Sequence, residues 1–232
     1  SLFGEVGAGG IVKNLGVTGD VSSYRCAAGI AGYNFGTISG CFSRVSVQAD
    51  GGGGLRGSGG IVGHNEGKVE YCINAGTVHN DYRRAGGIVG YNYGTAATID
   101  HCYNAGTVTS ANEGYAGAIA ATNGADAPTA GIITDCFYLT GSSAAAIGLD
   151  KAASSEATAF NANAMLLDGS GNPTAGSLKS ALNDPAARFI DAAAGAYPVL
   201  SWQSGYAWDT FTVSIAGAAG GTFTAKVNGT AI

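Results

Sequence analysis

Short apolar segments recur along residues 1–138, and Gly or Asn separates each of them from the next. The clearest unit spans Ala85 to Val108 and holds three such segments, rich in Ile, Val and Thr. Segments of about 4 to 6 residues with this composition predict β-strands joined by tight bends. Three short strands cannot enclose a hydrophobic core alone, so each unit must bury its apolar side against the next.

The copies of this unit align slot by slot. A leading isoleucine recurs at intervals of 31, 27 and 31 residues, as Ile30, Ile61, Ile88 and Ile119. A later slot holds Cys41, Cys72, Cys102 and Cys136, and another holds Asn34, Asn65, Asn92 and Asn123. Stacked copies turn each slot into a vertical row. We expect the Ile and Cys rows in the core and the Asn amides bonded to one another or to the bend backbone, where Asn tolerates left-handed geometry.

These rows predict an all-β fold, a parallel β-solenoid (β-helix) of about five coils over residues 1–138. Strands about 4.8 Å apart make five coils rise roughly 24 Å, and the general bias of parallel crossovers predicts right-handed winding. The first residues already fit the middle of a repeat, so we expect the chain to be part of a longer parent.

The period disappears after the fifth copy. Residues 139–209 predict a small mixed α/β cap, with short helices at 161–168 and 177–183 and a strand at 197–202. Such a cap would cover the exposed strand edges of the last coil. Residues 210–232 alternate in the manner of strands, and they predict either a hairpin on the cap or the start of a following module.

Composition and charge exclude several partners. The chain has 40 glycines, only 12% charged residues and a formal net charge of −5, with a pI near 5.0. It carries no basic run longer than Arg83-Arg84, which argues against nucleic acid as a partner. Gly, Asn or Ser interrupts every apolar segment, so we expect no membrane insertion. The oligomeric state stays open.

The cysteine row predicts buried packing instead of metal binding or disulfides. Its members lie about 30 residues apart, far from the close pairs of zinc sites, and they share a slot with Leu15. Stacked Cβ atoms with parallel vectors are poorly placed for disulfides. Cys26 lies in a variable bend, where we expect it to be more exposed. The three histidines fall in different slots, so we expect no metal cluster, and no cofactor is indicated.

The slots before each cysteine raise an enzymatic alternative. Glu70 and Asp100 fall in one row on adjacent coils, where their carboxylates could lie about 5 Å apart, as in glycoside chemistry. His101 follows Asp100, with Tyr71 and Asp135 in its own row. Polar residues vary freely on any solvated strand face, and fold analogy is weak evidence for chemistry. We therefore expect no catalysis and keep Glu70, Asp100 and His101 as the alternative.

An aromatic row offers a binding surface. Tyr33, His64 and Tyr91 share one slot, and Tyr93 stands two residues after Tyr91. Amphipathic aromatic residues are common at interfaces, so these four are candidate contacts for a sugar or a protein partner. Plain stacking of bend residues is the competing interpretation. A third row, Phe42, Ile73, Tyr103 and Phe137, is uniformly apolar and predicts core.

The central copies read Gly-Ile-Val-Gly-x-Asn-x-Gly, followed by Ile-x-x-Cys-Tyr-Asn-x-Gly-Thr-Val. This pattern resembles the GLUG-motif repeat of bacterial surface proteins, which include adhesin-like proteins and the non-catalytic part of some IgA1-cleaving peptidases. The resemblance implies a β-solenoid and an extracellular setting, either secreted or at the bacterial cell surface. It does not imply a catalytic site.

Together these features predict a non-enzymatic repeat segment. It would act as a rigid spacer and as an adhesion or ligand-binding surface toward a host or cell-surface glycan or protein. The variable bends at residues 50–57 and 80–84 would carry recognition. The alternative is a carbohydrate-active enzyme, a polysaccharide lyase or glycoside hydrolase with acidic residues on an exposed face.

Overall fold

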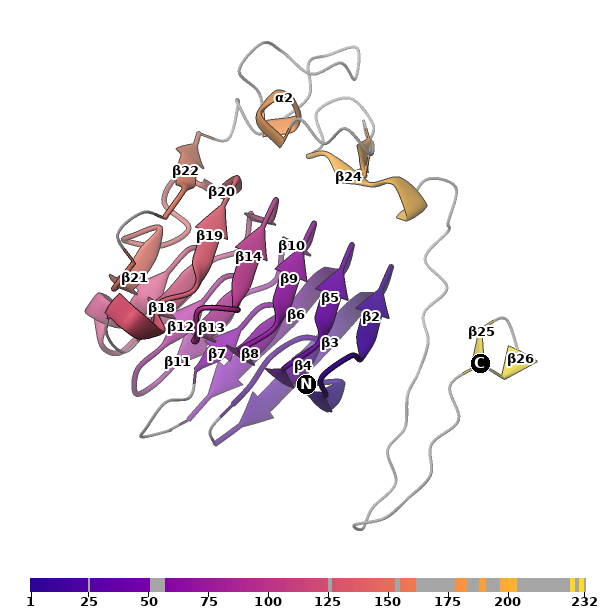
Figure 1. The fold of residues 1–232 in the computed structure, drawn as a ribbon, viewed down its shortest axis with the longest axis horizontal. Helices are drawn as coiled ribbons and strands as arrows, with labels where there is room; N and C mark the ends of the chain where they lie inside the picture. Colours follow the sequence, from indigo (N-terminus) through magenta and orange to yellow (C-terminus); the bar gives the residue numbers. More distant parts are fainter. Residues whose placement is uncertain are drawn as a thin grey trace.

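A computed structural model gives the fold, and it describes residues 1–24, 26–50, 57–124, 127–152, 155–161, 178–182, 188–190, 197–203, 226–227 and 230–231. Within these residues the chain winds into a stack of parallel strands, which Figure 1 shows side by side from the N-terminus to β22. The parallel β-solenoid of about five coils is confirmed. Its core lies between three long sheets.

The first long sheet takes one strand from every coil. Its order is β1 (Phe3–Val6), β4 (Ala31–Asn34), β8 (Val62–Asn65), β13 (Val89–Asn92), β18 (Ala120–Asn123) and β21 (Ile147–Asp150). The pairing is in register, with Asn65 opposite both Asn34 and Asn92. Equivalent slots therefore lie directly over one another.

The second sheet follows each strand of the first. It consists of β2 (Ile11–Lys13), β5 (Thr37–Ser39), β9 (Lys68–Glu70), β14 (Thr98–Asp100) and β19 (Ile132–Thr134). The corners after these strands lead to the third sheet. A short fourth sheet joins β7 (Ser58–Gly59), β12 (Ala85–Gly86) and β17 (Ala116–Gly117).

The third sheet closes each coil. It consists of β3 (Gly16–Ser23), β6 (Phe42–Ala49), β10 (Ile73–Asn74), β11 (Val78–Asn80), β15 (Tyr103–Asn104), β16 (Val108–Ser110), β20 (Cys136–Leu139) and β22 (Ala157–Phe160). Two single-turn 3-10 helices, η1 (Glu113–Tyr115) and η2 (Ala127–Thr129), lie in the bends of the fifth coil.

The interior is built from rows of branched and small side chains, as the repeat predicts. Backbone amides join the leading isoleucines in sequence, from Ile30 to Ile61, Ile61 to Ile88 and Ile88 to Ile119. These four residues have no exposed surface. The cysteine row packs in the same cluster, together with the row of Ile38, Val69, Ile99 and Ile133. The predicted core is confirmed.

The asparagine row forms a continuous ladder inside the bends. Asn34 donates to Asn65 at 2.8 Å, Asn65 to Asn92 at 2.8 Å, and Asn92 to Asn123 at 3.0 Å. The bends are bonded as well, since the amide of Asn65 donates to Gly67 O and accepts from Gly67 N. The expectation of left-handed geometry at these residues is wrong: each closes a strand, and positive φ occurs elsewhere.

The stack continues past residue 138, the expected end of the repeat domain. Strand β21 pairs in parallel with β18, and β22 pairs in parallel with β20. Asp150 takes the next place in the ladder, because Asn123 donates to its Oδ1 at 3.1 Å. The segment Ile147 to Asp150 keeps apolar residues at alternate positions and a polar acceptor at the end, which suffices for stacking although the glycine pattern is lost.

The C-terminal elements lie along one long side of the stack, as Figure 1 shows for α2 and β24. They are α2 (Leu178–Leu182), β23 (Phe189–Ile190), β24 (Val199–Leu200) and the 3-10 helix η3 (Ser201–Gln203). Strands β23 and β24 pair antiparallel. The helix at residues 177–183 is confirmed, the strand at 197–202 is shorter than expected, and residues 162–168 lie outside the described residues.

These elements cover the row of Phe42, Ile73, Tyr103 and Phe137. That row is buried, as predicted, but it forms a second cluster outside the solenoid interior, with Leu178, Leu182, Phe189 and Leu200 as its partners. Two polar contacts fix the docking: Trp202 Nε1 donates to Gly40 O at 2.8 Å, and Tyr103 Oη donates to Pro198 O. We call the described residues 178–182, 188–190 and 197–203 the flank segment.

Near the C-terminus, β25 (Lys226–Val227) pairs antiparallel with β26 (Thr230–Ala231). The strand expected from residue 210 lies outside the described residues. No helix in the described part of the chain combines the length and hydropathy of a membrane span.

Candidate functional site

The slot before each buried cysteine adopts a left-handed backbone. Asn14, Tyr71, His101 and Asp135 have φ angles of 53°, 53°, 48° and 47°, and Gly40 in the same slot has 60°. Residues with a Cβ rarely adopt this conformation, and Asn and Asp accept it best. The row therefore forms the corner between the second and third sheets. We call the corner residues and the ends of the strands before them the corner ridge.

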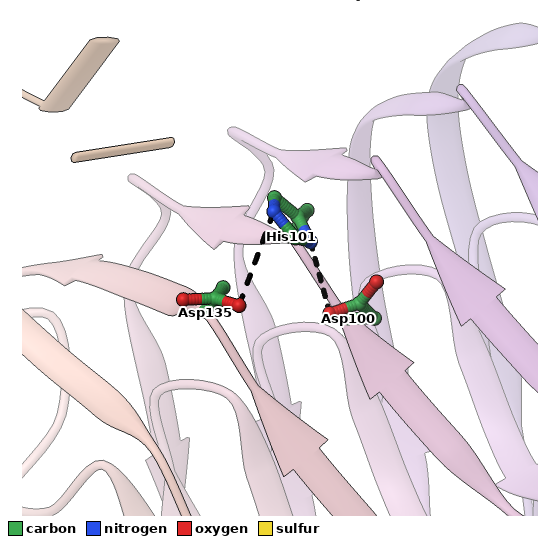
Figure 2. Close-up of side chains that lie close together, drawn as sticks. All are labelled: Asp100, His101 and Asp135. Carbon is green, nitrogen blue, oxygen red and sulfur yellow. Dashed lines mark ion pairs between the residues drawn. The ribbon is translucent and has the colours of Figure 1, made fainter. Parts of the chain in front are cut away.

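Three side chains of the corner ridge converge. Asp100 ends β14, His101 follows it at the corner, and Asp135 occupies the same corner one coil further. Figure 2 shows His101 between the two carboxylates. Nδ1 of His101 lies 2.9 Å from Oδ1 of Asp100, and Nε2 lies 3.9 Å from Oδ2 of Asp135.

The hydrogen bonds of His101 are incomplete. Its Nδ1 is buried, yet the approach to Asp100 lacks the direction of a hydrogen bond despite the short distance. His79 offers a contrast, because both of its ring nitrogens are bonded, one to Thr109 at 2.6 Å and the other to Asp81 at 2.7 Å. The Asp100 carboxylate accepts a bond from Thr134 Oγ1 at 2.8 Å, which orients it.

An ion pair lies on the coil before this group. Lys68 Nζ contacts Glu70 Oε2 at 2.6 Å, and Glu70 stands opposite Asp100 in the sheet register. The hydrogen bond that Lys68 donates to Glu70 raises the pKa of Lys68 above its usual value, although partial burial opposes the shift. Glu70 is thus engaged with an ammonium group.

The flank segment reaches the ridge through Arg188. Its guanidinium lies 4.4 Å from the ring centroid of Tyr71 and donates to Ser39 Oγ at 3.4 Å. Tyr71 in turn lies over His101, with ring centroids 5.2 Å apart. The ridge therefore combines residues of successive coils with a segment far along the chain.

Comparison with known proteins adds one finding. Residues 81–109 match the family model described as the GLUG motif. This chain carries a GLUG motif. No curated protein and no solved structure matches the chain.

The GLUG motif corresponds to one complete coil of the stack. It runs from the bend before β12 to β16, and it includes Asp100, His101 and Cys102. The match confirms the resemblance seen in the repeated pattern. The motif thus marks the coil that supplies Asp100 and His101 to the ridge.

The structure brings together the residues of the enzymatic alternative. Glu70, Asp100 and His101 are neighbours on adjacent coils, and Asp135 lies beside them, as their rows indicate. The expectation of no metal cluster considered only the histidines. One imidazole and two carboxylates from neighbouring corners do lie close, with their ligand atoms within 4.8 Å of one another.

Two charged residues of the ridge were missed. Lys68 lies two positions before Glu70, on the same face of β9, and strand periodicity could have shown the pairing. Arg188 lies outside the repeats, and no sequence pattern linked it to the GLUG coil.

The aromatic row is largely buried, which corrects the expectation of an exposed surface. Tyr91 is 0% exposed and His64 is 6% exposed. Arg84 lies 4.8 Å from the ring centroid of Tyr91, because the bend before β12 folds back over the first sheet. Tyr33 and Tyr93 are partly exposed and contact the His64 ring at 5.6 and 6.2 Å between centroids. Stacking of bend residues describes this row better than a binding surface.

The cysteine row is buried throughout, as predicted, and all five cysteines are free thiols. Burial raises the pKa of the Cys72 and Cys102 thiols well above the usual value. The pKa of Cys41 is also raised, mainly by its hydrogen bond with Cys72 and secondly by burial. The thiols of Cys72 and Cys102 also contact carbonyl oxygens at 3.2 Å. This row is structural.

Proposed function

We propose that this chain is a non-enzymatic repeat segment of a bacterial secreted or cell-surface protein. It acts as a rigid spacer that displays a binding surface for a glycan or a protein. The observation that carries the spacer role is the continuous stack, with parallel strand ladders and an unbroken Asn34–Asn123 hydrogen-bond ladder. The GLUG motif and its resemblance to repeats of surface proteins support the location.

Stiffness follows from how neighbouring coils are joined. Each inner coil is bonded to the coils on both sides by three long sheets, and buried side chains fill the space between them. Bending the stack requires opening these ladders on one side, and broken buried hydrogen bonds are costly. The same proposal includes a right-handed winding of the solenoid and a C-terminal region that covers the last coil.

Recognition is assigned to the bend at residues 80–84. Arg83 lies 4.7 Å from the ring centroid of Tyr115 and 6.0 Å from that of Tyr82, and Tyr82 is 53% exposed. No carboxylate pairs with Arg83 among the described residues. The exposed Tyr82 and the partly exposed Tyr115 beside an arginine suit an acidic sugar or an acidic peptide, since both can stack and form charge-assisted hydrogen bonds.

The test is a glycan-binding array with the intact chain, followed by affinity measurement on any glycan found. The double variant Tyr82→Ala/Arg83→Ala should lose at least about tenfold in affinity, the effect of one good charged contact. Tyr24→Ala is the matched control, because Tyr24 is 69% exposed on a different coil and should bind normally. Equal loss in both variants, or none in the double variant, would contradict this assignment.

The alternative is a carbohydrate-active enzyme, favoured only by the proximity of Glu70, Asp100 and His101. A polysaccharide-cleavage screen run beside the array separates the two. Turnover abolished by Glu70→Gln, but kept in Glu113→Gln on an exposed bend, would exclude the spacer role. The pairing of Glu70 with Lys68 argues against it, because the Lys68 ammonium already occupies Oε2 of that carboxylate.

A further inference from the structure

We propose that Asp100, His101 and Asp135 bind one divalent transition-metal ion, with Zn²⁺ as the working probe. The site lies at the corner ridge, where the GLUG coil meets the next coil. The inference is independent of the spacer role and of any glycan. It rests on three side chains whose ligand atoms lie within 4.8 Å of one another.

The distances suit a shared ion. Two ligand atoms about 2.1 Å from one tetrahedral ion lie about 3.4 Å apart. Nδ1 of His101 and Oδ1 of Asp100 are 2.9 Å apart, so this pair has to open by about 0.5 Å to hold such an ion. The Asp135 side chain is about half exposed, at 51%, so it can rotate to supply the third ligand. Water would complete the coordination.

The ligand set selects the class of ion. An imidazole nitrogen suits Zn²⁺, Co²⁺ and Ni²⁺, whereas Ca²⁺ and Mg²⁺ prefer an all-oxygen shell. The buried Nδ1 of His101 has no directed hydrogen bond, so an ion would satisfy an atom that the protein leaves unbonded. Thr134 holds the Asp100 carboxylate, in the way that outer residues orient metal ligands.

The local charges favour a dication. Within the described chain, neither Asp100 nor Asp135 forms an ion pair with Lys or Arg, and the ion-pair partner of both carboxylates is His101. The Lys68 ammonium on the preceding coil is paired with Glu70. A shallow recess of about 330 Å³ between residues 135–137 and 155–158 opens beside Asp135.

Metal binding would cross-link two neighbouring coils. Asp100 and His101 belong to the GLUG coil and Asp135 to the next one, so the ion would bridge the stack outside its backbone ladders. An ion that binds only the folded chain stabilises it by mass action. The melting temperature should therefore rise with Zn²⁺ concentration.

The test is titration of the intact chain with Zn²⁺ by calorimetry, with thermal melting in parallel. We expect one ion per chain and a rise in melting temperature. His101→Asn and Asp135→Asn should each weaken binding at least about tenfold. Asn is native to this left-handed slot at Asn14, so both variants are expected to fold, and circular dichroism checks this.

His79→Asn is the matched control, because His79 also pairs with an aspartate but is fully hydrogen-bonded, and it should bind Zn²⁺ normally. Co²⁺ absorption identifies the ligands, and the site predicts no thiolate charge-transfer band. Absence of saturable binding, equal affinity in His101→Asn, or a thiolate band from Cys26 would each overturn the proposal. Equal affinity for Ca²⁺ would also overturn it.

Discussion

At the scale of single residues, the asparagine side chains join neighbouring coils by hydrogen bonds. All four ladder asparagines are fully buried. Asn65 donates through Nδ2 to Asn92 Oδ1 and to Gly67 O, and its Oδ1 accepts from Asn34 Nδ2 and from Gly67 N. Buried polar groups are costly unless every partner is present. The ladder is therefore stable only as a complete row.

Replacing one member should expose this dependence. Asn65→Ala removes the bonds to Asn34, Asn92 and Gly67 and leaves their buried groups unpaired. We expect a loss of about 2–4 kcal/mol in the free energy of unfolding, measured by urea denaturation. Asn112→Ala is the control, since Asn112 is exposed and its side chain caps nothing. Equal losses in the two variants would contradict the ladder's role.

The buried thiols should not react with a thiol reagent in the folded protein. Only Cys26 is partly exposed, whereas Cys41, Cys72, Cys102 and Cys136 are buried. We expect Ellman's reagent at about pH 8 to titrate one thiol in the native chain and all five in urea. Rapid labelling of more than one native thiol would show that the row is accessible.

The raised pKa values add a pH dependence. In the unfolded chain the thiols ionise above about pH 8.5, while the folded chain keeps Cys72 and Cys102 protonated. Their stabilising contribution is complete below that pH and falls as the pH rises. Urea denaturation between pH 7 and pH 10 should show this decline, and a smaller decline in Cys72→Ala would assign it to the row.

Sequence predicted the residues that repeat and missed those that are unique. The buried cysteines were found because Leu15 shares their slot, and the ladder was found because Asn recurs. The left-handed corner was missed because Tyr71 and His101 occupy it, and neither residue signals positive φ. The burial of Tyr91 was missed because it depends on Arg84 in a variable bend.

At the scale of elements, the described residues of the flank segment lie along one long side of the stack. Its helix and its short strand were predicted from local pattern, but their place was not, because docking depends on the apolar row of Phe42, Ile73, Tyr103 and Phe137. A solenoid sheet ordinarily exposes its outer face to water. This row is apolar because another segment covers it.

Removing one anchor should loosen this cover. Phe189 is buried against the Tyr71 and Tyr103 rings, at 6.3 and 6.1 Å between centroids. Phe189→Ala should cost about 3 kcal/mol and raise hydrogen exchange in the flank segment and in β10 and β15. Phe35→Ala, at a partly exposed bend, should change stability by less than about 0.5 kcal/mol. Unchanged exchange in Phe189→Ala would contradict the docking.

At the scale of the whole molecule, equivalent residues of successive coils form a straight row along the stack. The second sheet brings Ile11, Thr37, Lys68, Thr98 and Ile132 into line, although 121 residues separate the first from the last. Such alignment follows from the repeat and could be predicted from sequence. The continuation through β21 and β22 could not, because packing there keeps the alternation but not the motif.

The most direct test measures the distance between the two ends of that row. Spin labels at Ile11→Cys and Ile132→Cys, in a Cys26→Ser background, occupy positions that are 68% and 52% exposed. Four strand steps of about 4.8 Å place the two Cα atoms about 19 Å apart. Pulsed electron paramagnetic resonance should give one narrow distance near this value, allowing for the label arms. A much longer distance, or a distribution without a defined maximum, would contradict the stacked coils.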